Sequence, residues 1–147
     1  MRILCVCLGN ICRSPMAEGA LRKRAAEEGI AIEVDSAGTG AYHIGQPPDP
    51  RGLAAASARG YDNTAQRARQ VADSDFHDFD LILAMDRANL RDLEARAPAT
   101  ARAEIRLFDA AGHEIPDPYY GGPEDYDRTL DMVEAATEAM IARLGRP

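Results

Sequence analysis

A cysteine and an arginine near the N-terminus have a spacing that suits phosphate chemistry. Five residues separate Cys7 from Arg13, and Ser14 follows the arginine. A cysteine thiolate is a strong nucleophile, and a guanidinium group can donate two parallel hydrogen bonds to the oxygens of a phosphate. The stretch therefore predicts an anion cradle with a thiolate at its base, able to attack phosphorus in line.

The residues around this stretch favour the same interpretation. The apolar run at 4–6 predicts a buried strand, and Ser14-Pro15 predicts a helix that begins with Ser14 as its N-cap. A helix N-terminus presents unpaired N–H groups and a partial positive charge, which attract phosphate. Gly9 allows close backbone approach, and Asn10 tolerates a left-handed conformation. The alternative is a buried strand cysteine followed by an ordinary surface loop.

Strands and helices are expected to alternate along the rest of the chain. After the strand at 4–6, further strands are expected at 30–34, 81–85 and 104–108. Helices are expected from Ser14 toward Gly29, from 49 to near 60, from Asp86 to before Pro98, and at 124–144, with a short helical turn at 73–79. This order predicts an α/β fold: a single three-layer domain over 1–147, whose four-stranded parallel sheet has helices on both faces and flavodoxin-like winding. Ligands of such sheets bind beyond the carboxyl ends of the strands.

Composition narrows the classes of function. The net charge of −7 disfavours partners with anionic backbones or headgroups, so we expect no nucleic acid and no membrane as partners. No stretch approaches the ~20 apolar residues of a membrane span, and the N-terminus does not resemble a signal peptide. We therefore expect a cytoplasmic protein, as a monomer or a weak homodimer. The three cysteines cluster at Cys5, Cys7 and Cys12, which is not the pattern of a disulfide framework.

The stretch at 7–15 resembles, residue for residue, the phosphate loop of the low-molecular-weight protein tyrosine phosphatases. The resemblance continues in order through most of the chain, at 35–38, 48–51, 68–71, 85–86, 89–90 and 117–120. It implies hydrolysis of protein tyrosine phosphate through a cysteinyl-phosphate intermediate. It also implies that no metal or other cofactor is needed, and that the partners are phosphotyrosine-containing proteins.

The resemblance implies a role for four residues in the reaction. Cys7 attacks phosphorus, and Arg13 holds the equatorial oxygens together with the loop amides. The hydroxyl of Ser14 bonds to the Cys7 sulfur and makes it a better leaving group. Asp117 protonates the departing tyrosyl oxygen and then activates the hydrolytic water. Without the resemblance, Asp117-Pro118 would be interpreted as a surface turn.

Further residues are expected around these four. Asn10 fixes the shape of the loop with Ser36 as its partner, and Asp86 orients Arg13. Tyr119 and Tyr120 form one wall for the aromatic ring, although from the sequence alone they could be ordinary half-buried aromatics. Tyr42 forms the opposite wall. The implied substrate-binding residues are Leu8, Gly9, Asn10, Ile11, Cys12, Tyr42, Tyr119 and Tyr120.

Some residues have more than one interpretation. In this family a neighbour such as Cys12 can form a reversible disulfide with the nucleophile, or it is simply a small side chain in a tight loop. Cys5 is expected to be a core residue. Gln66 stands where many members of the family have a histidine, and a glutamine cannot titrate. The three histidines, His43, His77 and His113, are expected to be solvated surface side chains.

Four other functions are weaker matches. An arsenate reductase of this fold would need further cysteines, and none follows Cys12. Protein-arginine phosphatases tend to have threonine after the loop asparagine, whereas Ile11 stands here and the Tyr119-Tyr120 pair favours a flat aromatic substrate. A metal-binding module would need a fourth ligand at zinc-like spacing. A protein that only binds phosphate would need neither a nucleophile nor an acid.

Overall fold

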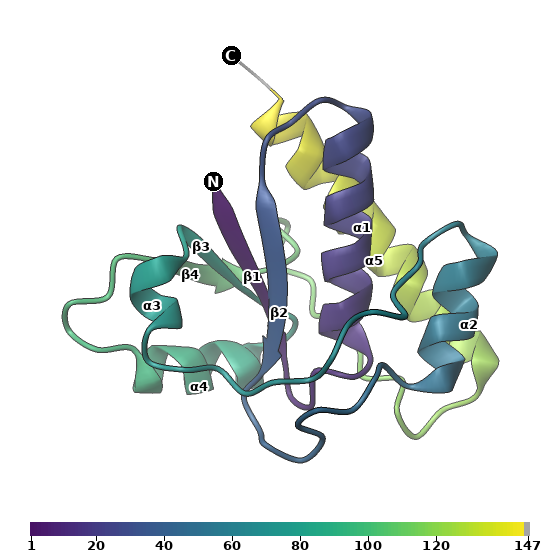
Figure 1. The fold of residues 1–147 in the computed structure, drawn as a ribbon, viewed down its shortest axis with the longest axis horizontal. Coiled ribbons are helices and arrows are strands. Elements are labelled where there is room, and N and C mark those ends of the chain that lie inside the picture. The colour runs from purple at the N-terminus through teal and green to yellow at the C-terminus, as the bar shows by residue number, and fades with distance from the viewer. Residues whose placement is uncertain (146–147) are drawn as a thin grey trace.

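The computed structural model describes residues 1–145, which form one α/β domain around a parallel four-stranded sheet (Figure 1). The elements in chain order are β1 (Arg2–Cys7), α1 (Arg13–Glu27), β2 (Glu33–Gly38), α2 (Pro50–Ala58), α3 (Asp75–Asp78), β3 (Leu81–Ala84), α4 (Arg87–Arg96), β4 (Glu104–Leu107) and α5 (Pro123–Leu144). The strands lie in the order β2-β1-β3-β4. The predicted fold class and winding are confirmed.

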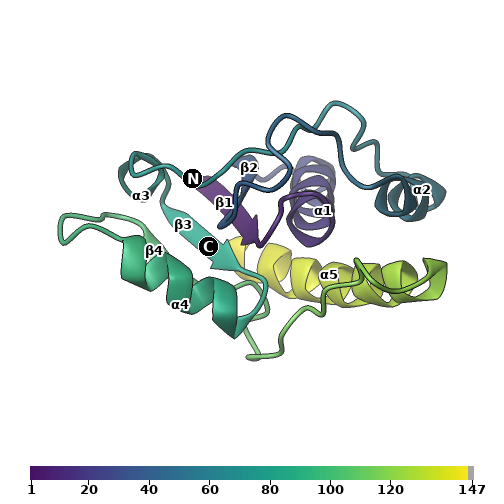
Figure 2. The same cartoon turned by 90° about the horizontal axis from the view of Figure 1, so that it is seen from below.

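The sheet separates two apolar cores. Side chains alternate between the two faces of a strand, so Ile3 and Cys5 of β1 lie in the core with α1 and α5. Leu4 and Val6 lie in the core that α3 and α4 cover. Figure 2 shows α1 and α5 beside each other on one side of the sheet, with α4 on the other side. Cys5 is a fully buried core residue, as predicted.

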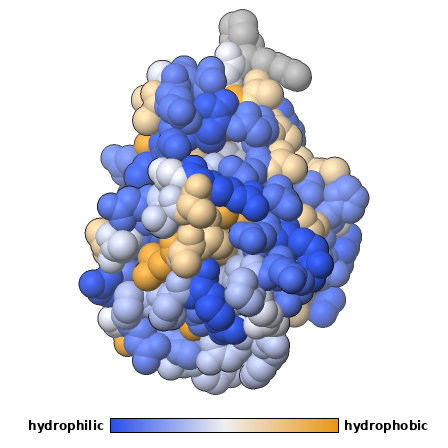
Figure 3. Space-filling view, turned by 90° about the vertical axis from the view of Figure 1, so that its right-hand side faces the viewer, coloured by the Kyte–Doolittle hydropathy of each residue, from blue (hydrophilic) through white to orange (hydrophobic). Residues whose placement is uncertain are grey.

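Large apolar side chains are largely confined to these cores. The face of the molecule that carries α2 is mostly polar and shows only small apolar patches (Figure 3). Among residues 1–145, no helix is both long and apolar enough to cross a membrane.

Helix α1 begins two residues earlier than predicted, at Arg13 rather than Pro15, and Ser14 is not its N-cap. The N-cap is Cys12, without a side-chain hydrogen bond to the helix. The Ser14 hydroxyl lies 3.0 Å from the Cys7 sulfur instead. The prediction of the other end holds: Gly29 follows the helix with φ +68°, a conformation that glycine adopts at little cost.

The predicted strand at 30–34 is wrong in its bounds, because β2 spans Glu33–Gly38. The reason is its pairing with β1, which runs in register from Arg2 opposite Glu33 to Cys7 opposite Gly38. Residues 30–32 form part of the connection between the end of α1 and the start of β2. The register places Ser36 beside β1 and brings Gly38 next to the loop that follows Cys7.

The carboxyl ends of the parallel strands lie at one edge of the sheet, where the connecting loops gather (Figure 1). Four loops follow these ends, at 8–12, 39–49, 85–86 and 108–122. The winding reverses at β1, since β2 pairs on one side of it and β3 on the other. This edge is where parallel α/β sheets bind ligands.

The contact between β2 and the first loop gives a prediction about Gly38. A Cβ atom at Gly38 would lie 2.7 Å from the carbonyl oxygen of Leu8 and 3.2 Å from the Gly9 carbonyl carbon, both backbone atoms. Gly38→Ala should therefore lower the free energy of unfolding by about 1–3 kcal/mol and reduce phosphate binding.

The control is Gly52→Ala, because a Cβ atom there meets only ordinary contacts, the nearest at 3.6 Å to the Tyr126 ring, within helix α2. Alanine is also the better helix former. Urea unfolding of both variants checks the prediction, and equal free energies of unfolding for the two would contradict it.

Candidate active site

A cleft of about 440 Å³ opens at the carboxyl edge of the sheet. Its lining comes from three segments that are far apart in the sequence: the loop after β1, the loop after β2 and the loop before α5. The lining residues are Cys7, Leu8, Gly9, Ile11, Cys12, Arg13, Tyr42, His43, Asp117, Tyr119 and Tyr120. The fold therefore brings together the predicted nucleophile, the predicted phosphate ligand and the predicted acid.

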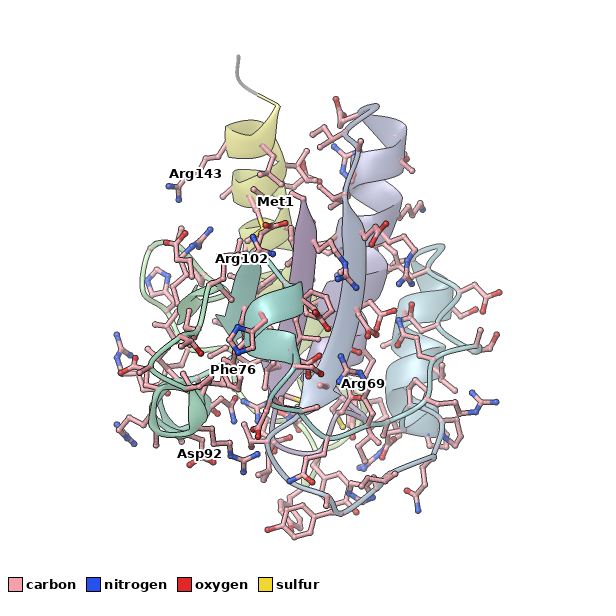
Figure 4. All side chains as sticks on the ribbon, turned by 60° about the vertical axis from the view of Figure 1, so that its left-hand side comes forward. Met1, Arg69, Phe76, Asp92, Arg102 and Arg143 are labelled. Atoms are coloured by element: carbon pink, nitrogen blue, oxygen red, sulfur yellow. The ribbon has the colours of Figure 1, made fainter. Side chains whose placement is uncertain are left out.

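The Asn10 side chain holds the first loop in shape. Asn10 has φ +57°, the only positive φ of a non-glycine residue within residues 1–145. Its Nδ2 donates to the hydroxyl oxygens of Ser14 and Ser36, at 2.8 and 2.9 Å. Its Oδ1 accepts from the backbone N–H of Arg69 at 3.0 Å. Arg69 lies near the loop end of β2 (Figure 4), so three segments meet at this one amide.

The Cys7 sulfur is buried and faces two hydrogen-bonding groups. The backbone N–H of Asn10 donates to Sγ at 3.3 Å, and the Ser14 hydroxyl lies 3.0 Å away. Because the Ser14 oxygen already accepts from Asn10, its own proton is available to donate to the sulfur. Both groups can therefore donate hydrogen bonds to the buried sulfur.

Arg13 is fixed from behind by Asp86. Its Nη1 donates to Asp86 Oδ2 at 2.6 Å and to the carbonyl oxygen of Ile115 at 3.1 Å. The other carboxylate oxygen of Asp86 accepts from the backbone N–H of Asn89 and caps α4. Burial acts to lower the pKa of Arg13, but the charges of Cys7 and Asp86 outweigh it and raise the pKa above its ordinary value. The guanidinium group is thus a fixed cation under the cleft.

Asp117 reaches the site from the far end of the chain. Its Oδ2 lies 3.7 Å from Nη2 of Arg13, and its side chain is 42% exposed. Its Oδ1 accepts from the backbone N–H of Tyr119 at 3.1 Å. A carboxyl group in this position is close to the predicted phosphate and still open to water.

Aromatic side chains surround the mouth of the cleft. The Tyr119 and Tyr120 rings meet edge to face at 5.0 Å, and Tyr120 is 95% exposed. Tyr42 lines the cleft as well and is 73% exposed. Leu8, at the same mouth, is another of the few large apolar side chains exposed within residues 1–145. The mouth therefore offers apolar surface to a ring that projects from the phosphate.

His43 is the cleft residue that the sequence interpretation missed. It was expected to be a solvated surface residue, but it lines the cleft with its ring 6.1 Å from that of Tyr119. Its Nδ1 forms a hydrogen bond with Oε1 of Gln46 at 3.0 Å. The one available signal was its position next to Tyr42. His77 and His113 are exposed, as predicted.

Gln66 forms its side-chain hydrogen bond with α1 and not with Asn10. Its Nε2 donates to the carbonyl oxygen of Pro15 at 3.2 Å, and its Oε1 is buried without a partner in the part of the chain described. Gln66 therefore supports the first turn of α1 rather than the loop amide. Within residues 1–145, no group of three or more His, Cys, Asp or Glu side chains is arranged to hold a metal ion.

Comparisons with known proteins agree on one family. Residues 2–147 match the family of low molecular weight phosphotyrosine protein phosphatases. The low molecular weight protein-tyrosine-phosphatase of Streptomyces coelicolor is 42% identical over 96% of this chain and 92% of its own. A protein tyrosine phosphatase from Entamoeba histolytica, solved with Hepes in its active site, has a TM-score of 0.92 and 40% identity over 98% of this chain and 96% of its own. A Drosophila arginine phosphatase has a TM-score of 0.91 and 31% identity over 97% of each chain.

The Arg13–Asp86 pair gives a second prediction. Asp86→Asn keeps a good N-cap for α4 but removes the charge that holds Arg13. We expect the affinity for inorganic phosphate to fall roughly tenfold, a loss of about 1.4 kcal/mol. Calorimetric titration with phosphate measures the change.

Asp80→Asn is the matched control, because Asp80 also pairs with an arginine, Arg102 at 2.6 Å, but lies outside the residues that line the cleft. Equal phosphate affinities for Asp86→Asn and Asp80→Asn would show that the pair does not position Arg13.

Proposed function

This chain belongs to the low molecular weight phosphotyrosine protein phosphatases, and from that premise we propose that it hydrolyses protein phosphotyrosine through a cysteinyl-phosphate on Cys7. The observation that carries the proposal is the meeting of three groups in one cleft. The Cys7 sulfur lies at its base, the Arg13 guanidinium lies beside it, and the Asp117 carboxylate lies 3.7 Å from that guanidinium. We propose that the reaction needs no metal or other cofactor.

In the first step, the Cys7 sulfur attacks phosphorus on the side opposite the tyrosyl oxygen. The S–P bond forms as the P–O bond breaks, and Asp117 gives its proton to the departing oxygen. Arg13 and the backbone N–H groups of the loop stabilise the charge on the equatorial oxygens. Because Asp86 and Ile115 already fix Arg13, this stabilisation requires little rearrangement.

In the second step, water attacks the phosphocysteine. The Asp117 carboxylate takes a proton from the water, and the S–P bond breaks to release inorganic phosphate. The sulfur leaves as a thiolate, and the nearby Ser14 hydroxyl and Asn10 N–H stabilise it through hydrogen bonds. Each step therefore uses Asp117 in a different protonation state.

The substrate is proposed to be a tyrosyl phosphate because the cleft mouth is lined by rings. Tyr42 and Tyr119 can contact both faces of an aromatic ring whose phosphate rests on the loop. A phosphoarginine substrate is the alternative, since one structural relative is named an arginine phosphatase. Ile11, an apolar lining residue, favours the aromatic substrate.

Arsenate reduction is disfavoured because no cysteine follows Cys12. A cytoplasmic location and a monomeric or weakly dimeric state stay predictions from the sequence.

The third prediction tests the proposed reaction. With EDTA present, the wild-type protein should hydrolyse an aryl phosphate, Cys7→Ser should be inactive, and Asp117→Ala should be slower by about 10²–10⁴-fold. Initial rates of phosphate release measure all three. Unchanged turnover by Cys7→Ser would remove the nucleophile assignment, and faster release from phosphoarginine than from phosphotyrosine would favour the alternative substrate.

We also propose that the site is sensitive to oxidation through Cys12. Peroxide would oxidise the Cys7 thiolate to a sulfenic acid and be reduced to water. The Cys12 sulfur would then attack the Cys7 sulfur, forming the S–S bond and releasing a second water. In the structure, Cys12 is a free cysteine whose sulfur lies 3.5 Å from the Tyr126 hydroxyl, and burial raises the pKa of its thiol to about 12.

The fourth prediction follows from that raised pKa. Because burial raises the pKa of Cys12 to about 12, Cys12 is almost entirely a thiol near neutral pH, and its small thiolate fraction rises about tenfold with each pH unit. Protection from irreversible oxidation should therefore improve as the pH of peroxide treatment increases from 6 to 8. Activity recovered with dithiothreitol measures protection, and Cys12→Ser should recover little at either pH. Full recovery by Cys12→Ser would contradict the disulfide.

A further inference from the structure

Arg51 links helix α2 to the loop that carries Asp117. Its Nη1 donates to the carbonyl oxygen of Gly121 and its Nη2 to that of Tyr119, both at 2.9 Å. The same guanidinium group donates from Nε and Nη2 to the two carboxylate oxygens of Asp49, at 3.0 Å each. One side chain thus joins a fixed carboxylate to two carbonyl groups that flank Tyr120.

The Asp49 end of this link is attached to the phosphate loop. The backbone N–H of Asp49 donates to the carbonyl oxygen of Ile11 at 2.9 Å. Its carboxylate also accepts from the backbone N–H of Arg51 and caps α2, and its side chain is only 11% exposed. The hydrogen bonds from Arg51 lower the pKa of Asp49, which keeps the carboxylate ionised at neutral pH.

Aromatic rings hold the guanidinium group in place. Its central carbon lies 4.8 Å from the centre of the Tyr126 ring and 5.8 Å from that of Tyr119. Arginine stacks well on such rings, and its planar fork loses less freedom for each hydrogen bond than a lysine would. The link between α2 and the loop is therefore built from groups with few alternative positions.

The loop has few other hydrogen bonds near Asp117. Within residues 1–145, the hydrogen bonds that residues 117–121 accept from outside this loop come from Arg51 alone. The remaining ones are internal, from Tyr119 N–H to the Asp117 carboxylate and from Gly121 N–H to Pro118. The ion pair of Asp117 with Arg13 is longer, at 3.7 Å.

We propose that Arg51 is a positioning residue for Asp117, which it holds at the distance from the phosphate loop that protonation of the leaving oxygen requires. The inference rests on the proposed function, since it gives Asp117 the acid role. Arg51 contacts the loop through backbone carbonyls two and four residues after Asp117. It sets where the acid lies without touching the phosphate, which Arg13 and the first loop bind.

The effect of losing Arg51 depends on how much the leaving group needs a proton. A phenolate of low basicity can leave without help, whereas a basic one needs the acid in place. A misplacement of about 1 Å can cost as much as 10²-fold in rate. Arg51→Met should therefore lower kcat/KM about tenfold or more for phenyl phosphate and much less for dinitrophenyl phosphate. A plot of log kcat/KM against the pKa of the phenol becomes steeper.

The matched control is Arg59→Met. Arg59 lies at the other end of α2 and pairs with Asp131 and Glu134 of α5, away from the Asp117 loop. It should leave the slope of that plot unchanged even if stability falls. Arg51→Lys, which keeps the charge but not the fork, should steepen the slope less than Arg51→Met and serves as the second variant if the methionine variant folds poorly.

Three outcomes distinguish failure of the positioning role of Arg51 from failure of the proposed phosphatase function. A steeper slope for Arg51→Met, with phosphate affinity unchanged and no further steepening when it is added to Asp117→Asn, supports the positioning role. A slope equal to that of the wild type, or an equal loss for every leaving group, overturns it while the proposed function stands. If the wild type does not hydrolyse aryl phosphates at all, the proposed function itself fails.

Discussion

The hydrogen bonds of Asn10 are the constraint on which the rest of the site depends. The loop after β1 must turn its backbone N–H groups inward, and this requires a left-handed residue at Asn10. A non-glycine residue adopts that conformation at some cost, which three side-chain hydrogen bonds offset. Because the Ser14 oxygen accepts from Asn10, the Ser14 hydroxyl can donate to the Cys7 sulfur, which lies 3.0 Å away. The shape of the cradle and the environment of the sulfur therefore have a single origin.

Support for Asn10 continues into the core through a buried acid. The Ser36 hydroxyl accepts from Asn10 and donates to Glu18 Oε1 at 2.6 Å, and Glu18 is almost fully buried in α1. A buried carboxylate is costly without a partner, and here Arg22 bonds to its second oxygen and to the carbonyl oxygen of Val34. A chain of hydrogen bonds thus connects the protein surface at Arg22 with the site, so the cradle is fixed by α1 and β2 together.

The sequence predicted what is local and missed what depends on pairing. The spacing of Cys7 and Arg13 identified the cradle, because one strand, one turn and one helix start build it. Residue types alone could not bring Asp117 to Cys7, since more than a hundred residues separate them; only the family resemblance did. The preference of serine for helix N-caps predicted the wrong position for the start of α1, whereas the family resemblance implied the contact of Ser14 with the Cys7 sulfur that the structure has. The bounds of β2 depended on its register with β1. His43 was missed because its only signal was its position next to Tyr42, and no motif includes it.

The two halves of the site differ in how firmly they are held, and the chemistry explains why. Arg13 is 3% exposed and bonded to two partners, which suits a group that must present fixed charge to every substrate. Asp117 is 42% exposed on a loop, which suits the proposed role of a group that exchanges protons with water between the two steps. The exposed carboxylate has only a long contact, at 3.7 Å, with the cradle. Its position is then set by contacts beyond the acid itself, and the carbonyl groups of Tyr119 and Gly121 accept such contacts from Arg51.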